Sequence, residues 1–261
     1  MMRTLFATML LSTSIFANNL NLEYSYGVDD FMIISDSSHT VGLSGGLYLH
    51  YIHDNGMSQK AHLEVSAQYD KLEHDIDHIP VLISGQYRVD KPLIYITPSI
   101  SLKSIVDFDW KMNTVSGVEQ SLKTALGWGV GYKGKSLSFG AYAFVGSNYF
   151  EIDDDTPRAY GYSRSELTKG YRPANGYILE FSYKILENID ISSSYRYWQE
   201  DSSWREKVFN FEMDFGLSDR SKIGLRVDSN LYNLAPLNIH TSPILPWHQD
   251  AMVHLFVKHR F

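Results

Sequence analysis

The sequence predicts an all-β fold, a closed antiparallel β-barrel of about twelve strands. Two observations predict it. Apolar and polar residues alternate along most of the chain, which is the period of a β-strand. Short and long connections also alternate between these runs, as expected for consecutive hairpins that meet at one end and are joined by loops at the other. No segment has a convincing helical period, so an antiparallel sheet is the expected architecture.

The composition excludes several classes of protein. The 261 residues include no Cys, which excludes a disulfide scaffold, a zinc-thiolate site and a cysteine nucleophile. The formal net charge of -7 argues against a nucleic-acid partner, which requires a basic surface. The mean hydropathy of -0.23 is ordinary for a soluble protein, and no run after residue 17 reaches the ~18–20 apolar residues of a membrane helix.

The first 17 residues have the features of a secretory signal peptide. Arg3 precedes the short apolar core Leu5 to Leu11, and the small residue Ala17 stands at the expected cleavage point. This core is too short to span a membrane. We therefore expect residues 1–17 to be a signal peptide and residues 18–261 to be one barrel domain, the alternative being a buried N-terminal helix.

The clearest strand pattern lies between Lys60 and Asp70. Ala61, Leu63 and Val65 begin one apolar face, and every second residue between them is polar. Counting all such runs gives strands at residues 20–27, 40–53, 59–70, 79–89, 92–103, 116–133, 136–148, 176–185, 189–198, 205–217, 221–232 and 249–261.

The connections fall into two classes. Short turns rich in Asn, Asp and Gly are expected at residues 54–56, 89–91, 134–135, 186–188 and 218–220. Longer connections are expected at residues 28–39, 71–78, 104–115, 149–175, 199–204 and 233–248. An even number of strands brings both chain ends to one side, as closure without a free edge requires.

The period alone does not say which face of the barrel meets solvent. A soluble barrel buries its apolar face inside, whereas a membrane barrel turns it outward to lipid. Aromatic residues such as Tyr51, Trp128 and Tyr132 lie near the ends of the apolar faces, where a membrane barrel carries its aromatic girdles. No acidic or basic residue falls mid-strand on these faces, where it would cost roughly 2–4 kcal/mol in lipid. The pattern favours a transmembrane barrel with short periplasmic turns and longer extracellular loops over a soluble sandwich.

The chain resembles Gram-negative outer-membrane β-barrel proteins of the porin-like kind. The resemblance lies in the signal segment 1–17, the alternating strands and the final strand 253–261, which ends on Phe261. It implies a location in the outer membrane, contact with lipid and lipopolysaccharide, and recognition of Phe261 by the barrel-assembly machinery. It implies fold and location far better than activity.

Charged residues of both signs occupy the polar faces, which point inward in such a barrel. The candidates for lining the interior are Lys60, Glu64, Arg88, Lys103, Glu119, Lys123, Glu180, Arg196, Glu212, Asp214, Arg226 and Asp228. Either these charges line a hydrated pore and tune its selectivity for small polar solutes, or they pair across the interior and close it. Twelve strands leave room for a narrow channel, whereas about eight are filled by side chains.

The connection at 149–175 is the longest and carries an acidic run. Asp153, Asp154 and Asp155 are followed by Arg158, and such a loop either folds inward as a constriction or stays outside as a binding surface. Asp oxygens suit a divalent cation, but the spacing is not that of a calcium loop. We expect no metal and no cofactor.

Two groups of residues raise the possibility of hydrolysis. His240 and Ser242 stand two apart, as in outer-membrane phospholipases, but in a Pro-rich loop. A loop with the residue types of a rim protease contains His74, Asp75, Asp77 and His78. Neither group is complete for its family. The expected function is a narrow channel for passive diffusion of small hydrophilic or charged solutes; the alternatives are a closed barrel acting through its loops in structure or adhesion, and a hydrolase.

Overall fold

The computed structural model describes residues 20–33, 39–70, 81–113, 118–152, 170–200, 204–234 and 248–260. These residues form the strands β1 (Leu20–Ile33), β2 (His39–Ile52), β3 (Ser58–Asp70), β4 (Val81–Thr97), β5 (Ile100–Asn113), β6 (Val118–Lys133), β7 (Leu137–Ile152), β8 (Gly170–Leu186), β9 (Ile189–Glu200), β10 (Trp204–Gly216), β11 (Ser221–Leu234) and β12 (His248–Arg260). The predicted all-β antiparallel sheet is confirmed. Among the described residues, no helix is long and apolar enough to span a membrane.

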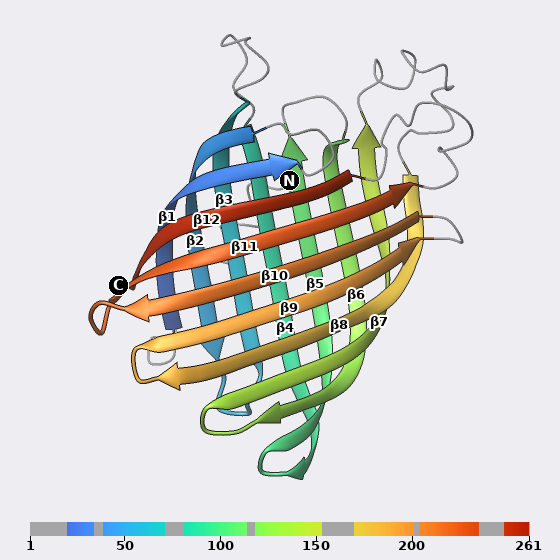
Figure 1. The fold of residues 1–261 in the computed structure, drawn as a ribbon. Helices are drawn as coiled ribbons and strands as arrows, with labels where there is room; N and C mark the ends of the chain where they lie inside the picture. Colours follow the sequence, from blue (N-terminus) through green and yellow to red (C-terminus); the bar gives the residue numbers. More distant parts are fainter. Residues whose placement is uncertain are drawn as a thin grey trace.

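Every strand pairs antiparallel with its neighbours in the chain, and β1 also pairs with β12 (Figure 1). The strand order therefore closes into a barrel. The register of the closing pair sets Tyr26 opposite Val257 and Gly27 opposite Phe256. Closure matters because it leaves no strand edge with unpaired backbone groups.

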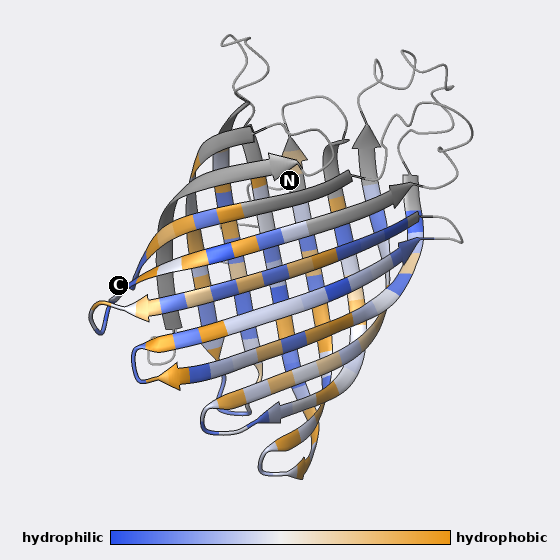
Figure 2. Cartoon of the chain, viewed as in Figure 1, coloured by the Kyte–Doolittle hydropathy of each residue, from blue (hydrophilic) through white to orange (hydrophobic). Residues whose placement is uncertain are grey.

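Contacts between distant strands identify the inward face. Arg88 on β4 forms an ion pair with Glu180 on β8, and these strands are not neighbours in the sheet. The rows that hold these two residues therefore face the interior, and the alternate rows face outward. Figure 2 shows the resulting alternation of hydrophilic and hydrophobic residues along the strands.

Large apolar side chains remain exposed on the outward rows. Leu255 is 63% exposed and Trp128 is 51% exposed. Others of the same kind are Leu43, Leu47, Val65, Phe108, Leu126, Val130, Tyr132, Phe139, Val145, Tyr177, Leu179, Phe181, Tyr183, Phe209, Ile223, Val253 and Val257. Soluble monomers rarely expose contiguous apolar surface of this extent.

Two short connections show why the chain turns where it does. In the β2–β3 turn, Gly56 has φ 80°, a left-handed conformation that suits glycine, and the Met57 N–H donates to Asn55 Oδ1 at 3.0 Å. In the β10–β11 turn, Ser218 Oγ accepts hydrogen bonds from the backbone N–H groups of Arg220 and Ser221 at 3.3 and 3.0 Å. The predicted turns at 54–56 and 218–220 are confirmed.

The predicted turn at residues 89–91 is wrong. β4 runs through this segment to Thr97, with Asp90 paired to Ile105 on β5. The chain turns instead after Thr97, whose Oγ1 accepts from the N–H groups of Ser99 and Ile100 at 3.3 and 3.0 Å. Asp90 resembles a turn residue in the sequence, but its carboxylate accepts hydrogen bonds from the Arg88 guanidinium.

This displaced turn also corrects the next connection. Residues 104–113, expected to belong to a long loop, form the second part of β5. Both ends of the predicted loop 149–175 are likewise strands, because β7 continues to Ile152 and β8 begins at Gly170. The predicted signal peptide 1–17 and Phe261 lie outside the described residues.

Apolar side chains also pack inside the barrel, on the inward rows of β5 to β9. The buried cluster consists of Ile105, Ala125, Tyr142, Phe144, Ala174, Ile178 and Trp198. The inward row of β6, to which Ala125 belongs, also contains Gly127, Gly129 and Gly131, the first two paired with Phe144 and Tyr142 of β7. A Cβ on Gly129 would lie 1.9 Å from the Ala141 carbonyl oxygen, so only glycine allows β6 and β7 to approach this closely.

Candidate functional site: the barrel interior

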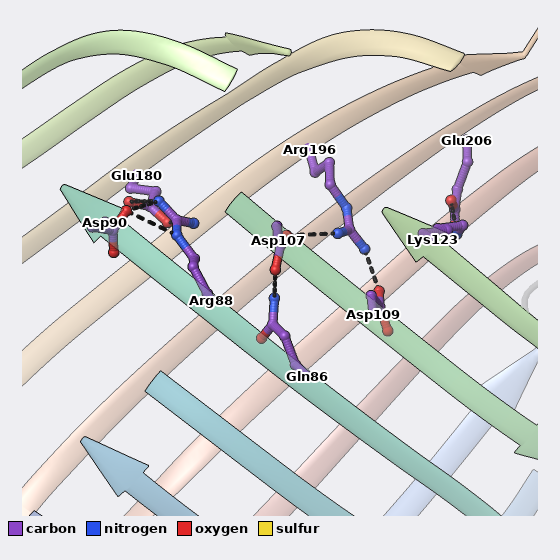
Figure 3. Close-up of polar contacts among 9 residues, drawn as sticks. All are labelled: Gln86, Arg88, Asp90, Asp107, Asp109, Lys123, Glu180, Arg196 and Glu206. Atoms are coloured by element: carbon purple, nitrogen blue, oxygen red, sulfur yellow. Dashed lines mark hydrogen bonds and ion pairs between the residues drawn. The ribbon is translucent and has the colours of Figure 1, made fainter. Parts of the chain in front are cut away.

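Three sets of ion pairs cross the interior between strands that are four apart in the sheet. They join Arg88 on β4 to Glu180 on β8, Asp107 and Asp109 on β5 to Arg196 on β9, and Lys123 on β6 to Glu206 on β10 (Figure 3). Each set connects β4–β6 with β8–β10. We call this part of the interior, together with the apolar cluster described above, the bridged side.

Arg88 is held by two carboxylates at once. Its Nη1 and Nη2 atoms bind both oxygens of Glu180, and its Nε and Nη2 atoms donate to Asp90 Oδ1 at 3.0 and 2.8 Å. The guanidinium carbon also lies 5.4 Å from the centre of the Tyr142 ring. A planar guanidinium suits this bidentate arrangement, which fixes the geometry as well as the charge.

Arg196 forms the second set of bridges. Its Nη2 donates to Asp109 Oδ2 at 2.5 Å and its Nη1 donates to Asp107 Oδ2 at 3.3 Å. Gln86 on β4 donates to the other oxygen of Asp107 at 3.1 Å. The Asp107 side chain is 3% exposed, so its charge depends on these partners rather than on water.

The third bridge is the most completely buried. The Lys123 and Glu206 side chains are 7% and 5% exposed. Trp198 lies beside this pair, with Lys123 Nζ 5.8 Å from its ring centre, and its indole N–H donates to Glu200 at 2.9 Å. Asn148 donates to the same Glu200 oxygen at 2.6 Å. Charged and aromatic groups thus occupy the interior together at this level.

Arg226 on β11 reaches across the other part of the interior. Its Nη2 donates to both oxygens of Glu64 on β3, at 2.8 and 3.0 Å, and its Nη1 donates to the Tyr48 hydroxyl at 3.1 Å. Asp228 lies 2.9 Å from Arg226 Nε and 3.0 Å from His254 Nε2. These residues come from β2, β3, β11 and β12.

Lysine side chains continue this polar lining toward the short turns. Lys258 on β12 donates to Glu212 at 2.5 Å, and Lys222 on β11 lies 3.4 Å from Asp190 and from Asp214. The residues we call the polar side are Tyr48, Glu64, Asp190, Glu212, Asp214, Lys222, Arg226, Asp228, His254 and Lys258. Several of them keep contact with solvent, since Asp228 is 29% and Glu212 25% exposed.

The two sides differ in what they can do chemically. A buried ion pair that loses one partner leaves an uncompensated charge at a high free-energy cost, so the pairs of Lys123 with Glu206 and of Arg196 with Asp107 are fixed. Partly hydrated pairs exchange their partners for water or a solute at a smaller cost. The polar side is therefore the part of the interior suited to contact with a passing solute.

The structure places most of the interior candidates on the inward rows. Lys60 and Lys103 lie on these rows, and neither forms an ion pair with another described residue. Glu119 stands at an irregularity in the β6–β7 register, and its side chain lies outside the described set. The other nine all take part in the ion pairs given above.

Three bridging carboxylates were not among the candidates. The sequence predicts a loop at residues 104–115, which leaves Asp107 and Asp109 out of the candidates, although Val106, Phe108 and Trp110 alternate with them in the sequence. Glu206 shares the parity of Glu212 along β10, so the alternation alone could have identified it.

The residues considered for hydrolysis or loop binding are outside the described part of the chain. They are His74, Asp75, Asp77, His78, Asp153, Asp154, Asp155, Arg158, His240 and Ser242. Within the described ranges, no group of three or more His, Asp or Glu residues is arranged to hold a metal ion. The interior network is therefore the candidate site that the structure places.

No protein-family model and no curated protein matches this sequence. Solved structures of outer-membrane barrels do match the fold. An outer membrane channel from Pseudomonas putida F1 is similar over 94% of this chain and 97% of its own, with TM-score 0.53 and 9% identity. The NanC porin is similar over 90% of this chain and 100% of its own, with TM-score 0.52 and 9% identity.

A third solved structure extends the likeness along the whole chain. The translocator domain of the autotransporter NalP from Neisseria meningitidis matches 100% of this chain and 95% of its own, with TM-score 0.50 and 8% identity. At such low identity the likeness concerns the fold alone. The predicted resemblance to porin-like outer-membrane β-barrels is confirmed at that level.

Proposed function

We propose that the protein is an outer-membrane channel that lets small hydrophilic solutes diffuse along the polar side of its interior. The observation that carries this proposal is that the barrel has its apolar residues outside and its charged residues inside, the reverse of a soluble barrel. Exposed apolar side chains such as Leu255 and Trp128 cover its outward rows, while the buried charges lie inside. An apolar exterior around a polar interior suits a barrel surrounded by lipid.

The position of the path follows from the two sides of the interior. Asp107, Lys123 and Glu206 are almost completely buried on the bridged side, where aromatic rings fill the space between the walls. Asp228 and Glu212 keep a quarter or more of their side chains exposed. A hydrated solute passes more readily beside groups that already contact water, since displacing their partners costs less.

The location rests on a separate argument. Closed barrels and helices are the two structures that satisfy all backbone hydrogen bonds within a bilayer, and this barrel closes through β1 and β12. The signal-like segment 1–17 supports export, and the short turns are then periplasmic and the longer connections extracellular. Fractionation of cells that express the full chain tests this location, which requires recovery in the outer-membrane fraction.

Conductance in planar bilayers tests the channel itself. The purified full-length protein is expected to give discrete current steps, and the absence of steps at every voltage would leave a closed structural barrel as the function. Asn210 and Phe209 provide a matched pair of sites, because they are adjacent on β10 and point to opposite sides of the wall, both exposed. Asn210→Trp is expected to lower the unit conductance, and Phe209→Trp is expected to leave it unchanged.

A further inference from the structure

A cavity of about 350 Å³ lies at the short-turn end of the barrel, lined by residues of the adjacent strands β6–β10 and the turn between β6 and β7. Its volume is within the range of small-molecule sites. Its polar lining includes Lys133, Lys135, Ser136, Ser138, Ser182, Lys184, Asp190, Ser192, Glu212 and Asp214. Lys133, Ser138, Ser182 and Lys184 belong to the inward rows, so the cavity is the inner mouth of the barrel at this end.

The carboxylates of this cavity already have cationic partners. Lys222 lies 3.4 Å from both Asp190 and Asp214, and Lys258 lies 2.5 Å from Glu212. Both lysines belong to β11 and β12, the two strands that follow β10 in the sheet, and neither lines the cavity. These three carboxylates therefore contribute little net negative charge to the cavity.

The lysines of β6, β8 and the β6–β7 turn that line the cavity lack such partners among the described residues. Lys133, Lys135 and Lys184 form no ion pair with any residue in the described part of the chain; although Lys184 lies opposite Asp190 in the register, that carboxylate is bound by Lys222. The lining itself therefore holds three lysines and three carboxylates, and only the carboxylates have charged partners, Lys222 and Lys258, outside the lining. The positive charges of the lining are thus the ones left available to a ligand, which favours the attraction of anions.

Hydroxyl groups complete the lining. Ser138 and Ser182 are hydrogen-bonded to each other, with 2.5 Å between their Oγ atoms, which leaves one of these two hydroxyls free to donate; Ser136 and Ser192 line the same cavity. Lysine ammonium groups supply charge and serine hydroxyls supply directional donors, which together suit the oxygens of an anion. We propose that this cavity binds a small free oxyanion, a carboxylate or phosphate, at the inner mouth of the channel.

The role of this site in permeation rests on the proposed channel function, but its binding does not. Line broadening of the ³¹P resonance of inorganic phosphate therefore tests it without a membrane, using the full-length protein in a phosphate-free detergent. Wild-type protein is expected to broaden the line well beyond micelles alone. Lys133→Gln/Lys184→Gln is expected to reduce this extra broadening at least threefold.

The control removes the same charge elsewhere. Lys91 and Lys207 are exposed and lie outside the cavity, so Lys91→Gln/Lys207→Gln is expected to broaden the line as the wild type does. Equal broadening by the cavity variant and this control, or none by the wild type, would overturn the site. Loss of broadening when phosphatidylglycerol is added to the micelles would assign the site to a lipid headgroup and overturn a free solute. Phosphate binding without any bilayer conductance would refute the channel and keep the site.

Discussion

The two sides of the barrel interior use the same residue types in opposite ways. On the bridged side, Lys123 is buried with Glu206 beside Trp198 and Arg196 with Asp107, while Arg88 is buried but its partner Glu180 is 32% exposed. On the polar side, Arg226 and Lys258 bind carboxylates that remain partly exposed. The difference between these pairs shows that the burial of a pair, rather than the presence of charge, decides whether it only stabilises the fold or can also contact a solute.

Breaking one buried bridge is expected to have the largest effect. Glu206→Leu leaves the Lys123 ammonium without its carboxylate in a site where it is 7% exposed, which should lower the free energy of unfolding by about 4 kcal/mol. Urea titration of the protein folded into lipid vesicles measures this change. The double variant Lys123→Met/Glu206→Leu should recover most of the loss, and a double variant as unstable as the single one would contradict the account.

Removing the aromatic filling tests the same side without touching a charge. Trp198 is 1% exposed, packs 5.0 Å from Phe144 between ring centres and donates a hydrogen bond to Glu200. Trp198→Ala should cost about 3 kcal/mol in the same titration, because it leaves a cavity and removes one of the two hydrogen bonds to the Glu200 oxygen. Trp128→Ala, on the outward row, is the control and should cost clearly less; equal losses would show that the interior is not packed.

The Arg226 bridge offers a charge on the polar side with partly exposed partners. Arg226→Gln removes the guanidinium that holds Glu64 and Asp228, which should cost about 1–2 kcal/mol of stability. It should also shift the bilayer reversal potential in a salt gradient toward greater cation selectivity, since two carboxylates lose their counter-charge. An unchanged reversal potential in a conducting variant would exclude Arg226 from the path.

The smallest effect is expected where the ion pairs are most exposed. The Lys222 side chain is 38% exposed and lies 3.4 Å from its carboxylates, so Lys222→Gln should change the free energy of unfolding by about 1 kcal/mol or less. Lys123→Gln, measured in parallel, should cost several times more. Equal costs would remove the distinction between the two sides.

The sequence allowed the strands to be predicted more fully than their partners across the interior. Alternation identified Arg88, Lys123 and Arg196 as inward, because the side of a strand residue depends only on its parity. The partner of each depends on which walls approach one another, as β4 approaches β8. That approach is set by barrel closure and by close contacts such as the one at Gly129, neither of which leaves a local pattern in the sequence.

Asp90 shows a second limit of prediction from local residues. In the sequence, Asp90 followed by Lys91 and Pro92 has the composition of a turn. In the fold, Asp90 is a buried acceptor for Arg88, and the strand continues beyond it. A tertiary contact thus overrides a local preference. The turn predicted from that preference lies too early in the chain, so the prediction leaves Asp107 and Asp109 in a loop.

Reaction of single introduced cysteines tests the division of the interior most directly, because the native chain has no Cys. Ser192 lines the inner mouth beside the polar side, and Ala125 is 6% exposed on the bridged side. With a charged, membrane-impermeant thiol reagent applied during bilayer recording, Ser192→Cys is expected to react and lower the current, while Ala125→Cys stays unreacted until the protein is unfolded. Equal reaction rates at the two positions would contradict a solute path confined to the polar side.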